Sequence, residues 1–174
     1  MKRAILMLTI GVAAACGQPA PKAAPAVGAT AGPTEIARPV SFAFDSLDAR
    51  PVSASAFLGK PTVLAFITTW DLLSQAQVDF LVAMAKHDEA KTNYTLVAMQ
   101  DKKERELIEQ YARTLGVTFP VALLDPEARS SAGTFGEIDH VPEVVVLDRE
   151  GRIAWRRTGL VKSDELRIVL SKLK

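Results

Sequence analysis

The sequence predicts an α/β domain in which a central mixed sheet is flanked by helices, and three observations support this. First, residues 62–67 form an apolar run rich in β-branched and aromatic types, which is typical of a strand covered on both faces. Second, a strand at 94–99 precedes an amphipathic helix that stops at Gly116, so the strand-helix order repeats. Third, an apolar period of three or four residues directly follows the first strand, carried by Leu73, Ala76, Phe80 and Met84.

The N-terminus predicts an export signal over residues 1–15. Lys2 and Arg3 precede an apolar run that is too short to span a bilayer. The run ends in three alanines before Cys16, the single cysteine of the chain. This resembles the lipobox of bacterial lipoproteins, in which the cysteine is lipidated and becomes the mature N-terminus. A lone thiol cannot form an internal disulfide, which favours this interpretation over an ordinary cleaved signal with a chance cysteine nearby.

Residues 16–39 are dominated by Ala and Pro without apolar periodicity, which predicts an extended tether. Residues 40–174 have the length of one domain. Without Lys2 and Arg3 the chain has 19 basic and 20 acidic residues, a net charge of −1, so nothing predicts a nucleic-acid partner. In enterobacterial lipoproteins an Asp after the lipidated cysteine favours the inner membrane, so Gly17 predicts the periplasmic side of the outer membrane in a two-membrane cell.

Local signals place the remaining elements. Helices are expected from the cap Asp71 to about His87, from Asp101 with Glu104 as a capping box, from Asp125 and Pro126 to about Phe135, and after a Ser163 cap. Gly151 tolerates the positive φ of a hairpin turn over residues 148–151. Strands are expected at 41–44, 52–54, 62–67, 94–99, 119–124, 143–147 and 153–160.

The turn from strand 62–67 into the helix resembles the active-site segment of the thioredoxin superfamily. The similarity is to the periplasmic thiol-disulfide branch, whose strand ends Phe-x-x-x-Trp-Cys-x-x-Cys. Phe66 and Trp70 hold their places, whereas Asp71 and Ser74 stand where the two cysteines would be. A thiolate is the species that attacks a disulfide, so these residues cannot perform the exchange. Ala65 also replaces a buried acid of classical thioredoxins, so the resemblance implies a redox-inactive member.

The same resemblance covers the later part of the chain. The strand at 119–124 with its following helix matches a strand-helix insertion of the periplasmic branch, and Pro142 matches a cis-proline that faces the dithiol. The resemblance implies a groove formed by Trp70, Asp71, Val141 and Pro142, in which an extended peptide pairs with the backbone. Each residue also has a simpler interpretation, since Asp71 caps a helix with no partner and Trp70 and Pro142 have packing roles.

His140 is the one candidate metal ligand. The segment Ile138–Asp139–His140 resembles the Val-Asp-His segment of copper-chaperone relatives, which bind copper through two cysteines and that histidine. Asp71 and His140, with or without Asp139, would be a harder ligand set that suits Cu(I) less well. A loop histidine without a ligand role is the simpler interpretation, so neither a metal nor another cofactor is expected.

The sequence therefore predicts a redox-inactive, thioredoxin-like lipoprotein of the bacterial cell envelope, anchored through Cys16, that binds or scaffolds an envelope protein or an extended peptide. Two alternatives remain open. One is a thiol-disulfide role in redox homeostasis that uses the thiols of a partner, and the other is metal handling at His140.

Overall fold

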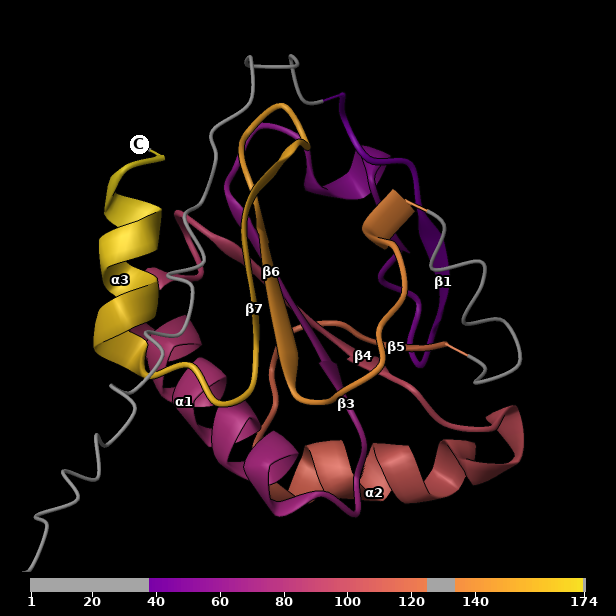
Figure 1. Cartoon of the computed structure of the whole chain (residues 1–174). Helices are drawn as coiled ribbons and strands as arrows, with labels where there is room; N and C mark the ends of the chain where they lie inside the picture. Colours follow the sequence, from indigo (N-terminus) through magenta and orange to yellow (C-terminus); the bar gives the residue numbers. More distant parts are fainter. Residues whose placement is uncertain (1–37, 125–133, 174) are drawn as a thin grey trace, which may run out of the picture. The chain divides into compact units, whose positions relative to one another are not determined.

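A computed structural model describes residues 38–124 and 134–173, all within one compact unit, Glu35–Lys174. Seven strands form one mixed sheet in the order β2-β1-β5-β4-β3-β6-β7 (Figure 1). β3 pairs in parallel with β4, and β4 with β5, whereas the other neighbours are antiparallel. The strands are β1 (Ala43–Ser46), β2 (Val52–Ser53), β3 (Thr62–Ile67), β4 (Asn93–Ala98), β5 (Val121–Leu123), β6 (Glu143–Leu147) and β7 (Ile153–Thr158).

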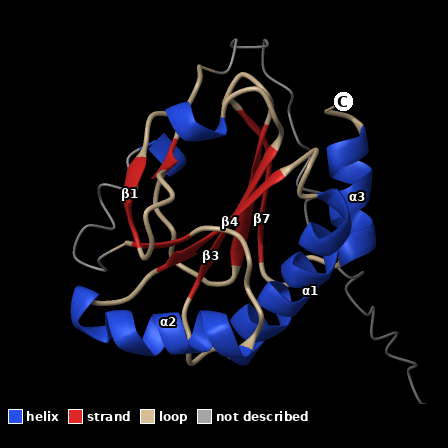
Figure 2. Ribbon diagram, turned by 180° about the vertical axis from the view of Figure 1, so that it is seen from behind, coloured by secondary structure: helices blue, strands red, loops and turns tan. Residues whose placement is uncertain are grey.

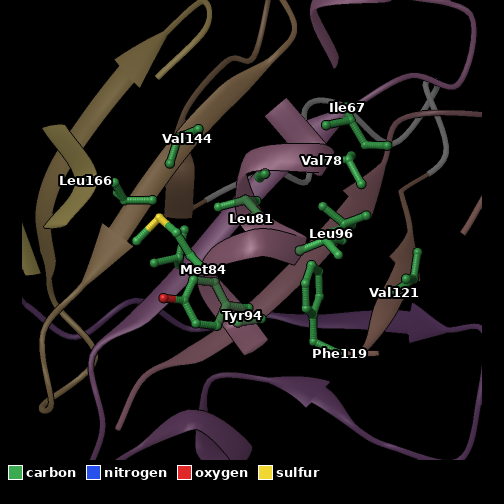
Figure 3. Packing of buried hydrophobic residues seen from close by; sticks show 14 of the residues in the cluster. Ile67, Val78, Leu81, Met84, Tyr94, Leu96, Phe119, Val121, Val144 and Leu166 are labelled. Atoms are coloured by element: carbon green, nitrogen blue, oxygen red, sulfur yellow. The ribbon is translucent and has the colours of Figure 1, made fainter. Parts of the chain in front are cut away.

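Three α-helices share one buried cluster with the sheet. They are α1 (Leu72–Asp88), α2 (Arg105–Thr114) and α3 (Ser163–Ser171), and short 3₁₀ turns cover Ser55–Phe57 (η1) and Lys102–Glu104 (η2). Alternate residues of a strand point to opposite faces, so Val63, Ala65 and Ile67 of β3 all meet the helical side. Figure 3 shows the centre of this cluster, and Figure 2 shows the helices from the side opposite to Figure 1.

The other face of β3 packs against aromatic side chains. Leu64 and Phe66 belong to a second cluster that includes Phe135 and Ile138. The ring of Phe66 meets those of Phe44 and Phe135 edge-on, with centroids 6.3 and 5.5 Å apart. Each such aromatic pair stabilises the fold by about 0.5–1.5 kcal/mol beyond the effect of burying its apolar area. Phe66 therefore fixes the segment that precedes Pro142 against the end of β3.

Several expected elements are confirmed within a residue or two. β3 has the expected limits, α1 begins after Asp71, and the turns at Gly116 and Gly151 have φ of +68° and +79°. The Asp101 carboxylate accepts a hydrogen bond from the amide of Lys103, but a 3₁₀ turn precedes α2 there. The helix expected from Asp125 lies mostly outside the described residues, as do residues 1–37 with the signal, most of the tether and Cys16.

Three local predictions are displaced by one or two residues. β1 begins at Ala43 instead of residue 41 because its register is set by pairing with β2 and β5. Ser163 is the first residue of α3 instead of its cap; Lys162 stands at the cap without a side-chain hydrogen bond. The predicted strand at 119–124 shrinks to β5, since only its middle pairs with β4.

The predicted apolar face of α1 is only partly correct. Met84 is fully buried as predicted, but Leu73 is 49% exposed and Phe80 is half-buried, whereas Ser74 and Gln77 are fully buried. The physical reason is a pair of hydrogen bonds between Gln77 and Val161. The side-chain amide of Gln77 donates to the carbonyl of Val161 at 3.2 Å, and its oxygen accepts the backbone amide of Val161 at 2.7 Å. These bonds to a distant loop turn the polar residue inward, so the apolar period does not identify the buried face.

Candidate functional site

The turn between β3 and α1 carries three exposed apolar side chains. The side chain of Trp70 is 67% exposed, that of Leu72 is 77% exposed and that of Leu73 is 49% exposed. We call these three residues the apolar rim. Single exposed apolar residues are common, but an exposed tryptophan followed closely by two exposed leucines offers an apolar contact surface beside the Asp71 carboxylate.

Both residues at the expected cysteine positions support the turn. The Asp71 carboxylate accepts a hydrogen bond from the amide of Ser74 at 2.7 Å, which makes Asp71 the N-cap of α1. Ser74 is fully buried, and its hydroxyl accepts the amide of Thr68 at 3.4 Å. An N-cap of this kind stabilises a helix by about 1 kcal/mol. Neither side chain can replace a thiolate in disulfide exchange.

A neighbouring phenol adds to the electrostatics of this turn. Burial, together with the charges of Asp79 and Asp71, raises the pKa of Tyr111 to about 12. Tyr111 belongs to α2, so this helix brings its hydroxyl near the N-terminus of α1. The phenol therefore stays neutral at any physiological pH.

The buried side-chain amide of Gln100, which follows β4, stabilises the same turn. The Oε1 atom of Gln100 accepts the amide of Thr69 at 2.7 Å, and its Nε2 atom donates to Glu104 at 3.3 Å. Gln100 has no exposed surface. Sequence reasoning missed this residue, although a polar side chain directly after a buried strand was a usable signal. The hydrogen bond from Thr69 to Gln100 fixes the backbone immediately before Trp70.

The Val141–Pro142 peptide bond is cis, as the resemblance implied. β6 begins directly after it, and Glu143 pairs with Phe66, so Pro142 lies beside the end of β3 that leads to Trp70. The carbonyl of Pro142 accepts the amide of Gly159 at 2.7 Å. Within the described residues no backbone hydrogen bond uses the amide or carbonyl of half-buried Val141. The backbone of Val141 is therefore available to pair with another chain.

Glu143 adds a buried carboxylate at this end of the sheet. Its side chain is 2% exposed and forms an ion pair with Arg156 of β7. Arg156 also donates to the carbonyls of Phe135 and Glu137, the latter at 2.9 Å, and so holds the segment before the cis-proline.

Glu143 is a different acid from the one that the resemblance would place at Ala65. Ala65 is fully buried in the helix-side cluster, whereas Glu143 pairs with Phe66, whose side chain packs on the other face of the sheet, so no carboxylate takes the place of Ala65 there; the buried acid of this end of the sheet is Glu143. Sequence reasoning missed it because the partner, Arg156, lies on another strand. The signal was one charged residue at the start of an otherwise apolar strand.

The histidine candidate lies in an exposed loop. Asp139 and His140 are both exposed. Across residues 38–124 and 134–173 there is no group of three His, Cys, Asp or Glu side chains placed to hold a metal ion. Cys16, the predicted lipidation site, lies outside these ranges.

The geometry thus brings four of the predicted site residues to one end of β3 and β6. Trp70 supplies an exposed aromatic ring, Asp71 fixes the helix start, and the cis peptide presents the open backbone of Val141. Backbone pairing with apolar contact is how an extended peptide is held at such an edge. The dithiol positions hold no sulfur.

No family model matches the sequence, and neither does any curated protein. Solved structures do match. A thiol:disulfide interchange protein of the thioredoxin family from Chlorobium tepidum TLS is 20% identical, with a TM-score of 0.69 over 79% of this chain and 96% of the other. A DsbF homologue from Corynebacterium diphtheriae is 24% identical, with a TM-score of 0.69 over 83% and 96% of the two chains.

A secreted thiol-disulfide isomerase from Corynebacterium glutamicum is 19% identical, with a TM-score of 0.69 over 77% of this chain and 83% of the other. At such identities similarity extends to fold and not to activity. Together with the mixed sheet and the cis-proline, these likenesses show that the chain has the thioredoxin fold.

Proposed function

We propose that this chain is a redox-inactive thioredoxin-fold module of the bacterial cell envelope, tethered through lipidated Cys16, that binds an extended peptide segment of an envelope protein. The peptide lies between Trp70 and the cis Val141–Pro142 bond. One observation carries the proposal: exposed Trp70 lies at the same end of the sheet as Val141, whose amide and carbonyl form no backbone hydrogen bond among the described residues. Asp71 and Ser74 stand there at the two positions where the resembled family has cysteines.

The envelope location rests on the export signal and on one likeness. Residues 1–15 have the pattern of a secretory signal, and the similar Corynebacterium glutamicum protein is described as secreted. Among the residues that the structure describes, no helix is both long and apolar enough to cross a membrane. A lipid anchor would hold the domain at a membrane without such a helix.

Site-specific photocrosslinking tests the position of the binding surface. Short linear peptides are first selected from a displayed library for binding to the full chain. A photoreactive residue is then placed at Leu72 of the apolar rim or, as a control, at Ile168 of α3, which is 59% exposed. We expect the selected peptides to crosslink from position 72 and not from position 168. Equal crosslinking at the two positions, or none at 72, would refute the assignment.

A thiol-disulfide role in concert with a partner's thiols is the second candidate. The similar solved structures are thiol:disulfide interchange proteins and isomerases, which favours this class over an unrelated binding function. In that case the module would position a substrate while another protein supplies the thiolate, because the thioredoxin-like site of this chain contains no cysteine.

Insulin reduction separates the two candidates. In dithiothreitol alone, the full chain is expected to leave the rate of insulin precipitation at the background rate. Acceleration of that rate by the chain without any other thiol protein would contradict the redox-inactive proposal. Acceleration only when a thiol protein of the same envelope is added would favour the second candidate.

A further inference from the structure

A cavity of about 710 Å³ lies at the opposite end of β3 from the apolar rim. Its walls come from the turn before β3, the loop between α1 and β4, the β6–β7 hairpin and the last turn of α3. This volume is within the usual range for small-molecule sites. The charged or polar residues that line it include Lys60, Asp88, Lys91, Thr92, Arg149 and Arg167.

The cations of this cavity are poorly compensated within the protein. Among the described residues Lys60, Lys91 and Arg149 form no ion pair. Arg167 approaches Asp164 at 3.4 Å, but that carboxylate is 93% exposed, so the pair contributes little. In contrast, six other arginines lie against carboxylates: Arg50, Arg105, Arg113, Arg152, Arg156 and Arg157.

The net charge of the cavity indicates the kind of ligand. α1 ends at Asp88 and α3 ends at Ser171, and both residues line the cavity. Each helix C-terminus brings about half a negative charge. Four cations, less these two helix ends and the Asp88 carboxylate, leave about two positive charges. A phosphate group matches this charge, and Arg and Lys are its usual protein partners.

The chain also enters the domain at this end. The amide of Val40 donates to the carbonyl of Gly151 at 2.8 Å, and Gly151 belongs to the hairpin that carries Arg149. If Cys16 anchors the chain, the membrane that holds it is a source of lipid phosphates.

We propose that this cavity binds a phosphate-bearing anion, either a soluble phosphate monoester or the headgroup of an anionic phospholipid. Lys60, Lys91, Arg149 and Arg167 hold the phosphate oxygens through charge-assisted hydrogen bonds. The site lies apart from Trp70 and Pro142, so a test of phosphate binding does not depend on whether the peptide-binding surface is correct.

Binding is measured on the full chain in two ways. Calorimetric titration uses inorganic phosphate and glycerol 3-phosphate, and co-sedimentation uses phosphatidylcholine vesicles with and without phosphatidylglycerol. The test variant combines Lys60→Glu with Arg149→Glu. The control combines Lys102→Glu with Lys103→Glu, which makes the same charge change on η2, after the other end of β4.

We expect the test variant to bind at least about tenfold more weakly and the control to bind as the wild type does. Lys91→Gln, a milder change at the same cavity, should also weaken binding, so one variant that fails to fold does not decide the outcome. Binding to soluble phosphates alone, or to phosphatidylglycerol vesicles, identifies the source and supports the site. No binding to either probe, or equal weakening in the control, would overturn it.

Discussion

At the N-terminus of α1, Asp71 exploits the same field that a thioredoxin-like dithiol would use. Unpaired amides and the helix dipole stabilise negative charge there, whether it is a thiolate or a carboxylate. The Asp71 carboxylate accepts a hydrogen bond from one of these amides, that of Ser74. The hydroxyl of Ser74 accepts a hydrogen bond from the amide of Thr68. Asp71 and Ser74 therefore stabilise the turn locally through these two hydrogen bonds.

Replacing Asp71 should separate capping from charge. We expect Asp71→Ala to lower the free energy of unfolding by about 1 kcal/mol and Asp71→Asn to recover most of that loss, because Asn is an equally good N-cap. Urea denaturation measures both. If Asn costs as much as Ala, the carboxylate charge, and not the cap, is what the turn requires.

Arg156 should stabilise the fold because it forms an ion pair with the buried Glu143 carboxylate. Arg156→Met leaves the buried Glu143 carboxylate without its ion pair, which we expect to cost about 2 kcal/mol or more. Adding Glu143→Gln removes the buried charge, so the double variant should be more stable than the single one. Thermal and urea unfolding of both provide the test. A double variant no more stable than Arg156→Met would mean that the buried charge is not the cause.

At the scale of elements, the sequence indicates best those segments whose environment is uniform. β3 was predicted to the residue because all six of its side chains are buried and its pattern has no competing period. α1 was correctly located by its cap, but its buried face was not, since apolar residues occur around much of its circumference. The inward turn of Gln77 depends on Val161, 84 residues away, which no local pattern encodes.

The same limit explains the partial success at the site. Trp70, Asp71, Ser74 and Pro142 were placed because they belong to contiguous motifs. Glu143 and Gln100 were missed because their roles depend on Arg156 and Thr69, which the fold brings from other segments.

Two glutamines on α1 offer a matched comparison. Gln77→Leu removes a donor to the Val161 carbonyl and an acceptor for its amide, and leaves both backbone groups buried. We expect a loss of about 2 kcal/mol in the free energy of unfolding. Gln75→Leu, on the exposed side of the same helix, should change it by less than about 0.5 kcal/mol. Similar losses in both variants would show that the Val161 bonds contribute little.

At the scale of the whole molecule, β3 and α1 connect two ends with different properties. The apolar rim and the cis-proline lie at one end, and the cationic cavity and the chain entry at Val40 lie at the other. α1 has 17 residues and spans about 25 Å. The two proposed binding sites therefore lie at opposite ends of the same domain.

Cys16→Ser tests the proposed anchor. If Cys16 is acylated, the substitution should move the chain from the membrane fraction to the soluble fraction of cells and lower its mass by that of the acyl groups. Fractionation with immunoblotting and intact-mass spectrometry measure the two effects. An unchanged distribution together with an unchanged lipid mass would rule out the lipoprotein assignment.

The affinity of the Trp70→Ala variant for a selected linear peptide tests the central proposal most directly. If Trp70 is an interface anchor, the substitution should cost about 2 kcal/mol, or roughly 30-fold in Kd, with almost no change in Tm, because the side chain is 67% exposed. Ile168→Ala, a control on α3 whose apolar side chain is also mostly exposed, should leave both quantities unchanged. A lower Tm with unaltered peptide affinity in Trp70→Ala would instead make Trp70 a structural residue and contradict the proposed binding surface.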